Sequence, residues 1–347
     1  MEEKSSKKTL TYSHIRNAGK EILEYIDQRR KGLVHSLATR WDKFNKATMG
    51  GLDWNVIMTI AGMSGSGKSS IANDLETSLF DNNPDENFSV LSFNFEMLAM
   101  KQVGRKISHK LYRTVGQLYS SNEDLDDEMY QRAENVVNSI SRKYSIYYVD
   151  IPGTVEEMYH TIMHFHEMRK TKTQDEEYGT VILIDHTLLT KHKAGDSERE
   201  SLVKLYRMMM LAKKEIKCIF IVISQLNREI EKSDRMTNPM QNYPMKKDIF
   251  GSDAVFHGSD YVLITHKPYM LNMQTYGPHH LPVINPEKPS QPMIYWHILK
   301  NRDGESGIVM SMVDILKYNR VDEYDIPDEK GQLKIEDIDK INNNKKE

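Results

Sequence analysis

A glycine- and serine-rich segment, Gly62–Ser69, reads Gly-Met-Ser-Gly-Ser-Gly-Lys-Ser and fits the pattern G-x-x-x-x-G-K-[ST]. Glycines allow the backbone to curl so that several N–H groups converge on phosphate oxygens. The ammonium group of Lys68 can then reach the β- and γ-phosphates, and the hydroxyl of Ser69 can ligate Mg²⁺. An apolar stretch precedes the segment and a helical pattern follows it, as this motif requires. The predicted phosphate-binding residues are Gly62, Ser64, Gly65, Ser66, Gly67, Lys68, Ser69 and Ser70.

Three polar residues follow apolar segments that are typical of buried strands. Asp185 ends Val-Ile-Leu-Ile, where proteins with this motif hold a metal-binding carboxylate, so Ser69 and Asp185 are the predicted Mg²⁺ ligands. Glu96 ends Ser-Phe-Asn-Phe and can polarise an attacking water. Gln225 ends Ile-Val-Ile-Ser, where an amide can sense the γ-phosphate. Ligands of open α/β sheets bind where the strands end, so these residues are expected in one site.

Lys300 and Arg302 are two residues apart near the end of a later predicted strand. Residues at this spacing lie on the same face of a strand. Two interpretations remain open. The pair can form an exposed basic edge, or it can stabilise transition-state charge as an arginine finger supplied by a neighbouring subunit.

Alternating apolar and helical segments must position these residues. The short, continuous apolar segments are typical of strands buried on both faces of a parallel sheet. The repeated strand–helix order predicts an α/β fold in which helices flank a mostly parallel central sheet. The predicted strands are 55–61, 88–95, 144–150, 180–184 and 218–224, and the predicted helices are 99–119, 125–143 and 154–170.

Different patterns flank this core. We expect residues 1–32 to comprise a disordered start and an amphipathic linker helix at 12–31, which either packs on its own core or docks on a neighbouring subunit. Residues 33–318 are the predicted main domain, and residues 319–347 are expected to form an acidic, flexible tail. Within the domain, residues 226–250 look like a loop, and 268–292 hold six of the eleven prolines. Strands are predicted at 260–266, 293–299 and 307–313.

Composition excludes several classes of protein. The 347 residues are 39% hydrophobic and 28% charged, and the mean hydropathy is −0.62. No apolar run approaches the ~20 residues of a membrane span, and the start of the chain is polar and lacks an apolar signal core. The single cysteine, Cys218, excludes an internal disulfide. We therefore expect a cytoplasmic protein without membrane partners.

The net charge of −3 argues against a broad basic surface but allows a local basic channel.

The run Ser-Gln-Leu-Asn-Arg at residues 224–228 is similar to a motif of DnaB-type replicative helicases. The order of the surrounding features resembles that family over about residues 33–316. These features are Thr39, Trp41-Asp42, Gly50-Gly51-Leu52, the phosphate-binding segment, Glu96-Met97, Asp185, residues 248–253 leading towards Asp260, and the Lys300-x-Arg302 hairpin followed by a glycine.

The resemblance implies a RecA-like ATPase that forms a hexameric ring, uses ATP and Mg²⁺, and binds ATP between subunits. Lys68 and Ser69 would bind phosphate and Mg²⁺, while Glu96 would activate water and Asp185 would support the metal. Gln225 would couple the γ-phosphate to the DNA loops, and Lys300 and Arg302 would reach the neighbour's site.

The resemblance also implies that single-stranded DNA threads the central channel. The matching DNA-contacting loop is Phe250, Gly251, Ser252 and Asp253, which would hold phosphates largely through backbone groups. Lys191, Lys193 and Arg199 add positive charge beyond Asp185, although a solvated face explains these residues equally well. A loader, a polymerase or a primase are further implied partners, through contacts that the sequence does not identify.

Departures from the family pattern are also present. His186-Thr187-Leu188 replaces the usual Tyr-Leu-Gln, Phe250 stands where an arginine is common, and Phe256-His257 replaces Glu-Gln. These changes affect the expected DNA contacts and leave the ATP site intact. About 32 residues precede the core, where bacterial members carry a primase-binding domain, so a minimal helicase of the kind that phages encode is expected, without the usual primase contact.

The sequence thus predicts an ATP-dependent ring-shaped helicase that translocates on single-stranded DNA and unwinds duplex DNA. Two alternatives share the same core. One is a RecA/RadA-like recombination ATPase that forms filaments. The other is an accessory subunit of a replication complex that binds ATP and does not unwind DNA.

Overall fold

The computed structural model describes residues 12–120, 125–185 and 197–325. Contacts divide the chain into two units, residues 1–36 and 37–347. In the first unit, α1 (Ile15–Arg30) confirms the predicted amphipathic helix. The imidazole of His14 caps this helix by accepting a hydrogen bond from the Arg16 N–H, and Ile22 and Ile26 are exposed. Docking of α1 on a neighbouring subunit stays a prediction.

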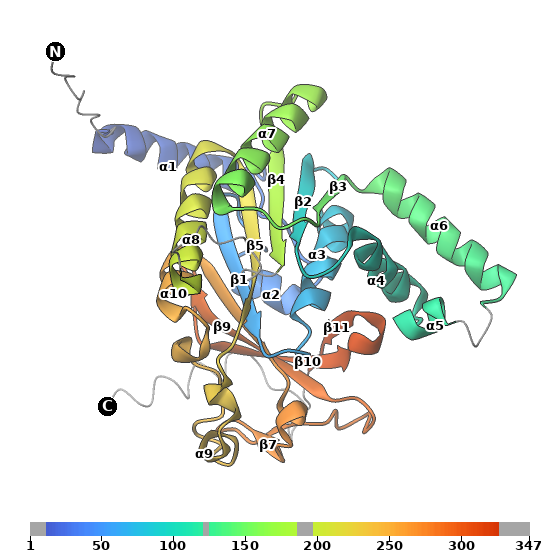
Figure 1. Ribbon diagram of the computed structural model, residues 1–347. Helices are drawn as coiled ribbons and strands as arrows, with labels where there is room; N and C mark the ends of the chain where they lie inside the picture. Colours follow the sequence, from blue (N-terminus) through green and yellow to red (C-terminus); the bar gives the residue numbers. More distant parts are fainter. Residues whose placement is uncertain (1–11, 121–124, 186–196, 326–347) are drawn as a thin grey trace, which may run out of the picture. The chain divides into compact units, whose positions relative to one another are not determined.

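A nine-stranded sheet forms the centre of the second unit (Figure 1). Its strand order is β11-β10-β9-β6-β1-β5-β4-β2-β3. The six strands from β6 to β3 in this order are parallel, and β9, β10 and β11 are antiparallel. The sheet strands are β1 (Val56–Gly62), β2 (Phe88–Asn94), β3 (Ile146–Val149), β4 (Gly179–Asp185), β5 (Cys218–Gln225), β6 (Tyr261–His266), β9 (Met293–Asn301), β10 (Ile308–Ile315) and β11 (Arg320–Glu323).

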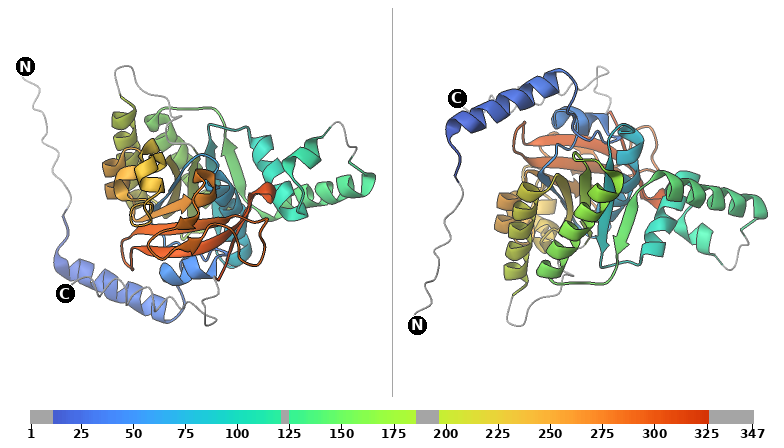
Figure 2. Two further views of the ribbon diagram at one scale, coloured as in Figure 1. Left: turned by 90° about the horizontal axis from the view of Figure 1, so that it is seen from below. Right: turned by 90° about the horizontal axis from the view of Figure 1, so that it is seen from above.

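Helices cover both faces of this sheet, as the α/β prediction required. The α-helices described in the second unit are α2 (Asp42–Ala47), α3 (Lys68–Asn82), α4 (Ala99–Leu111), α5 (Val115–Tyr119), α6 (Asp127–Lys143), α7 (Val155–Thr173), α8 (Glu198–Glu215), α9 (Ser233–Met236) and α10 (Ser252–Gly258). The 3₁₀ turns are η2 (Arg228–Glu231), η3 (Lys246–Asp248), η4 (Pro268–Leu271) and η5 (Leu316–Tyr318). Figure 2 shows α5 and α6 extending away from the β3 edge of the sheet.

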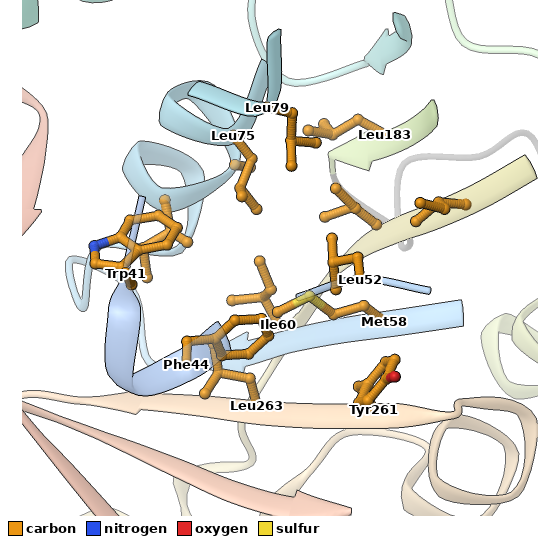
Figure 3. Close-up of a cluster of buried hydrophobic side chains, with 14 of the residues drawn as sticks. Trp41, Phe44, Leu52, Met58, Ile60, Leu75, Leu79, Leu183, Tyr261 and Leu263 are labelled. Atoms are coloured by element: carbon orange, nitrogen blue, oxygen red, sulfur yellow. The ribbon is translucent and has the colours of Figure 1, made fainter. Parts of the chain in front are cut away.

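Alternate residues of β1 point into two separate cores, because successive side chains of a strand face opposite sides. Met58 and Ile60 pack with Leu75 and Leu79 of α3, together with buried residues of the 37–52 segment such as Phe44 (Figure 3). On the other face, the core combines β1 residues with the apolar sides of α7 and α8. The two cores cover both faces of the sheet. They therefore hold the strands firmly, and with them the residues at the strand ends that form the site.

Local signals in the sequence explain where several helices begin and end. Thr154 and Glu157 form a reciprocal capping box at the start of α7, and Ser197 and Glu200 do the same for α8. The predicted helix 99–119 is two helices, α4 and α5, because the backbone turns left-handed at Tyr112 (φ 53°). The sequence at this position gives no glycine signal for the break.

The carboxyl-terminal third confirms the predicted strands and corrects one boundary. Residues 268–292 form a largely irregular segment with a two-stranded sheet, β7 (Thr275–Tyr276) and β8 (Leu281–Pro282), around the buried ring of Tyr276. The predicted tail starting at 319 is wrong at its start. Residues 320–323 form β11, which pairs with β10, and Val321 is buried in the core.

Cys218 is a buried residue at the start of β5, and burial raises the pKa of its thiol to about 12. Within the described ranges, no helix combines the length and the apolar character that a membrane span requires.

Trp296 of β9 is fully buried and packs edge-on against Trp41, with the ring centroids 4.8 Å apart. We expect Trp296→Ala to lower the free energy of unfolding by about 3–5 kcal/mol, because it leaves a large cavity between the sheet and the 37–52 segment. Met240→Ala, at a side chain that is 64% exposed, should change it by less than about 0.5 kcal/mol. Urea unfolding curves of the two variants measure the difference, and equal midpoints would contradict this view of the core.

Candidate functional site

The phosphate-binding segment forms a tight loop between β1 and α3, as predicted. Gly65 and Gly67 have φ angles of 76° and 97°, which side chains other than glycine rarely tolerate. A Cβ atom on Gly67 would also lie 2.9 Å from the Leu316 side chain. Gly67 is the N-cap of α3, so the open end of the loop coincides with the positive end of a fifteen-residue helix.

Internal hydrogen bonds hold this loop in shape. The carbonyl of Met63 accepts hydrogen bonds from the Ser66 hydroxyl at 2.8 Å and from the Lys68 ammonium at 2.7 Å. The hydroxyl of Thr265, at the end of β6, donates to the Ser66 carbonyl at 2.9 Å and ties the loop to the neighbouring strand. Sequence reasoning missed Thr265, because a threonine at the end of a strand carries no motif.

The structure brings Lys68, Ser69, Asp185 and Glu96 together at the edge where the parallel strands end, here termed the carboxyl edge. Burial lowers the pKa of Lys68 to about 8, although the charges of Asp185 and Glu96 oppose this shift. Burial and the nearby Glu96 charge raise the pKa of Asp185 to about 6, against a hydrogen bond from Ser69. Glu96 itself is exposed at the rim of the site.

Arg105 on α4 is a further site residue that the sequence analysis missed. Its charge acts on Asp185 and favours the ionised carboxylate. The adjacent Lys106 forms a fully buried ion pair with Glu76 of α3, at 2.6 Å, which fixes α4 against the helix that follows the phosphate loop. Arg105 lies nine positions after Glu96 on the next helix, and this spacing was the signal available in the sequence.

The donor set fits a magnesium ion. Oδ1 of Asp185 is buried and has no hydrogen-bond partner within the described residues, and the Ser69 hydroxyl bonds to the same carboxylate. A hard cation such as Mg²⁺ prefers carboxylate and hydroxyl oxygens and takes few protein ligands beside phosphates and water. Ser69 and Asp185 are therefore suited to hold Mg²⁺ beside the phosphate loop.

Gln225 stands at the carboxyl edge between this site and the loop at 250–253. In the sheet it pairs with Gly62, the first residue of the phosphate loop. The next residue, Leu226, donates its N–H to the Gly62 carbonyl at 3.3 Å, and Phe250 donates its N–H to the Gln225 carbonyl at 3.0 Å. Backbone hydrogen bonds thus connect the phosphate loop, Gln225 and residue 250 in one continuous series.

The loop predicted to contact DNA leads directly into α10. Gly251 caps that helix with φ 61°, Phe250 and Ser252 are half-buried, and Asp253 is exposed. The carboxylate of Asp253 lies 3.3 Å from the Lys246 ammonium and 3.6 Å from the Arg199 guanidinium, so cations offset its charge. Lys191 and Lys193 lie outside the described residues, as do residues 186–188.

A buried ion pair organises the polar segment that precedes this loop. The guanidinium of Arg235 bonds to both carboxylate oxygens of Asp248 and to the carbonyls of Gln241 and Tyr243. Both side chains are almost fully buried. The sequence indicated only a polar loop at 226–250, because local patterns do not show which distant charges will pair.

The structure does not bring Lys300 and Arg302 to the phosphate loop of the same chain. Arg302 donates its backbone N–H to the Asp260 carbonyl, before β6 begins, whereas the phosphate loop lies at the opposite end of β1 and β6. The five steps along the chain from Asp260 to Thr265 span about 17 Å of extended strand. The two cations therefore belong to the opposite edge of the sheet, here termed the amino edge.

Comparison with known proteins gives a consistent result. The family model described as DnaB-like helicase C-terminal domain matches residues 36–321, which is most of the chain. A solved structure of an ATPase domain is 19% identical with a TM-score of 0.69, over 90% of this chain and 100% of that one. A structure of a DnaB-like replicative helicase and its interactions with primase is 18% identical with a TM-score of 0.68, over 92% and 69%. At these identities both structures show a shared fold, a RecA-like P-loop NTPase core. The search of curated proteins finds no match.

The raised pKa of Asp185 predicts that the folding stability of the metal-free protein depends on pH. The folded state keeps a proton on Asp185 that the unfolded chain releases above about pH 4, so this contribution to stability falls between about pH 4 and pH 6 and stays lost above. We expect Asp185→Asn without Mg²⁺ to be about 2–3 kcal/mol more stable than the wild type at pH 7.5. The advantage should disappear near pH 4, as measured by urea unfolding. A constant difference at both pH values would contradict the assignment.

Proposed function

The chain belongs to the DnaB-like helicase C-terminal domain family, and from this membership we propose that it is an ATP-driven, ring-forming DNA helicase. In this proposal six copies assemble with ATP between adjacent subunits. The ring translocates on single-stranded DNA and separates duplex DNA ahead of it.

The continuous series of backbone hydrogen bonds from Gly62 through Leu226 and Gln225 to Phe250 carries this proposal. It links a phosphate site to a loop on a neighbouring element through two backbone hydrogen bonds. A γ-phosphate that bonds to the Gln225 amide would therefore bias the position of residues 250–253 directly. A motor protein needs such a link, because each hydrolysis event must change its grip on the track.

Residues at the carboxyl edge have separate roles in hydrolysis. The N–H groups of the phosphate loop and the Lys68 ammonium bind the β- and γ-phosphates, where the low dielectric strengthens their attraction. Glu96 is exposed at the rim and accepts a proton from the attacking water. Ser69 and Asp185 would hold Mg²⁺, which neutralises charge on the phosphates.

The cations at the amino edge complete the site of a neighbouring subunit in this proposal. Arg302 is 52% exposed on the side chain and lies at the edge opposite its own phosphate loop. A guanidinium provided in trans would stabilise charge that develops on the transferred phosphoryl group. Each active site then needs two chains, which supports a ring as the working form.

DNA is held in the proposal by a narrow set of contacts and not by a basic surface. Gly251 and Ser252 present backbone N–H groups at the start of α10, and backbone N–H groups bind DNA phosphates. Lys246 and Arg199 offset the negative charge of Asp253 beside them. This arrangement is compatible with a net charge of −3 for the whole chain.

Lys68→Ala should abolish ATP hydrolysis stimulated by single-stranded DNA, because it removes the only charged side chain by which the loop can bind the β- and γ-phosphates. A colorimetric assay of the released phosphate measures the rate of hydrolysis. Lys214→Ala, which removes an exposed lysine from α8, is the matched control and should hydrolyse ATP like the wild type. Robust hydrolysis by Lys68→Ala would refute the site assignment.

Strand displacement by the purified wild-type protein on a forked duplex tests the function itself. The proposal requires ATP-dependent separation of the strands, and the Lys68→Ala protein should not separate them. Electron microscopy of the same sample should show closed or spiral rings. Filaments on DNA would favour a recombination ATPase, and rings that hydrolyse ATP without unwinding would favour an accessory subunit.

Arg302→Ala should bind ATP with the wild-type affinity but lose turnover, because it removes a group that acts only on a neighbour. Glu96→Gln should also lose turnover, through its own site. Mixed rings contain interfaces at which an intact Glu96 of one subunit faces an intact Arg302 of its neighbour, so mixing the two inactive variants should restore hydrolysis. Failure to restore activity at every mixing ratio would contradict the role in trans.

A further inference from the structure

Asp260 is a buried carboxylate that connects the candidate finger to the centre of the sheet. It lies between α10 and β6, and its side chain is 5% exposed. Oδ2 accepts hydrogen bonds from the backbone N–H of Ile57, at 2.8 Å, and from the Lys213 ammonium, at 2.6 Å. Oδ1 accepts a hydrogen bond from Nε of Arg302 at 2.5 Å.

We propose that Asp260 is the positioning residue of the Arg302 finger. The proposal rests on the function proposed above, in which Arg302 acts on the ATP of a neighbouring subunit. Asp260 binds Nε, which lies on the stem side of the guanidinium group, and within the described part of the chain Nη1 and Nη2 have no hydrogen bond. The two terminal amino groups therefore remain for phosphate oxygens while the rest of the side chain is held.

The two oxygens of Asp260 divide their partners in a way that supports this role. Oδ2 accepts its hydrogen bonds from Ile57, near the start of β1, and from Lys213 on α8. Both contacts keep the carboxylate itself in place. Oδ1 has Arg302 as its partner, whose side chain is half exposed. Both of the first two contacts go to Oδ2 and hold the carboxylate in place, so Oδ1 forms a rigid anchor beneath an exposed cation.

Pre-organisation explains why such an anchor matters. A free arginine side chain has many rotamers, and this freedom must be lost when it binds a phosphate. A charge-assisted hydrogen bond at Nε removes much of that freedom before the neighbouring subunit binds ATP. Lys300 is anchored separately, because its ammonium donates to the Phe256 carbonyl at 2.6 Å. Asp260 therefore holds Arg302 by a direct hydrogen bond, whereas Phe256 holds Lys300.

The decisive experiment is subunit mixing with Asp260→Asn, which keeps the shape of the side chain and removes its charge. Under the proposal, Asp260→Asn alone binds ATP normally, retains the circular dichroism spectrum of the wild type, and hydrolyses ATP at least about tenfold more slowly. Mixing with Glu96→Gln should restore hydrolysis, because Glu96→Gln supplies an intact finger. Mixing with Arg302→Ala should restore nothing, because every finger in such rings is impaired.

Other outcomes identify what has failed. If Asp260→Asn is restored by Arg302→Ala and not by Glu96→Gln, the residue supports its own site and the proposal is wrong. Turnover close to the wild-type rate for Asp260→Asn alone would also overturn it. If Arg302→Ala and Glu96→Gln fail to complement each other, the role of Arg302 in trans is wrong, which is a failure of the proposed function.

Lys213→Met provides a matched control for damage to the buried cluster. It breaks the other ion pair of the same carboxylate and leaves the Arg302 contact in place. We expect its ATP turnover to stay within about twofold of the wild type, since Asp260 keeps its bond from Ile57. An equal loss of turnover in Lys213→Met and Asp260→Asn would show that general disruption, and not the orientation of Arg302, causes the effect.

Discussion

Burial of opposite charges at one sheet edge is the constraint on which the rest of the site depends. Lys68 and Asp185 are both withdrawn from water. Burial lowers the pKa of Lys68 and raises the pKa of Asp185, so it favours the neutral form of each side chain. Each charge is only partly compensated by the other, so the site attracts further ions of both signs. In the proposed function phosphate oxygens and a divalent cation would supply them, and their binding would offset the cost of burying the two groups.

The two edges of the sheet divide the chemistry between them. In the proposed function the carboxyl edge would bind phosphate and activate water, whereas the amino edge presents Lys300 and Arg302, about one strand length away. Between the edges runs α10, which follows its N-cap Gly251 in the proposed DNA loop and ends two residues before Asp260. Phe256 on this helix holds Lys300 through its carbonyl and its ring. The anchor of Lys300 therefore belongs to the helix that follows the proposed DNA loop, and the anchor of Arg302, Asp260, comes two residues after that helix ends.

Sequence reasoning succeeded where local pattern and fold agree. The phosphate loop, the strands that end in Asp185 and Gln225, and the α/β class follow from short-range periodicity and from the geometry of parallel strands. It failed where the structure depends on contacts between residues that are far apart in the sequence. Nothing local indicates that Arg235 will pair with Asp248, that Thr265 will bond to the phosphate loop, or that residues 320–323 will add a final strand. The two predicted DNA-side lysines, Lys191 and Lys193, stay untested because they lie outside the described residues.

The lone cysteine has a practical consequence. Cys218 lies at the start of a central strand with no exposed surface, and burial raises the pKa of its thiol to about 12. A thiolate is the reactive species, so the native protein should be nearly inert to alkylating reagents. Reaction at this position then reports opening of the sheet centre. A single cysteine introduced on an exposed helix would meanwhile be the one readily labelled position, which makes the chain a convenient host for a site-specific fluorophore.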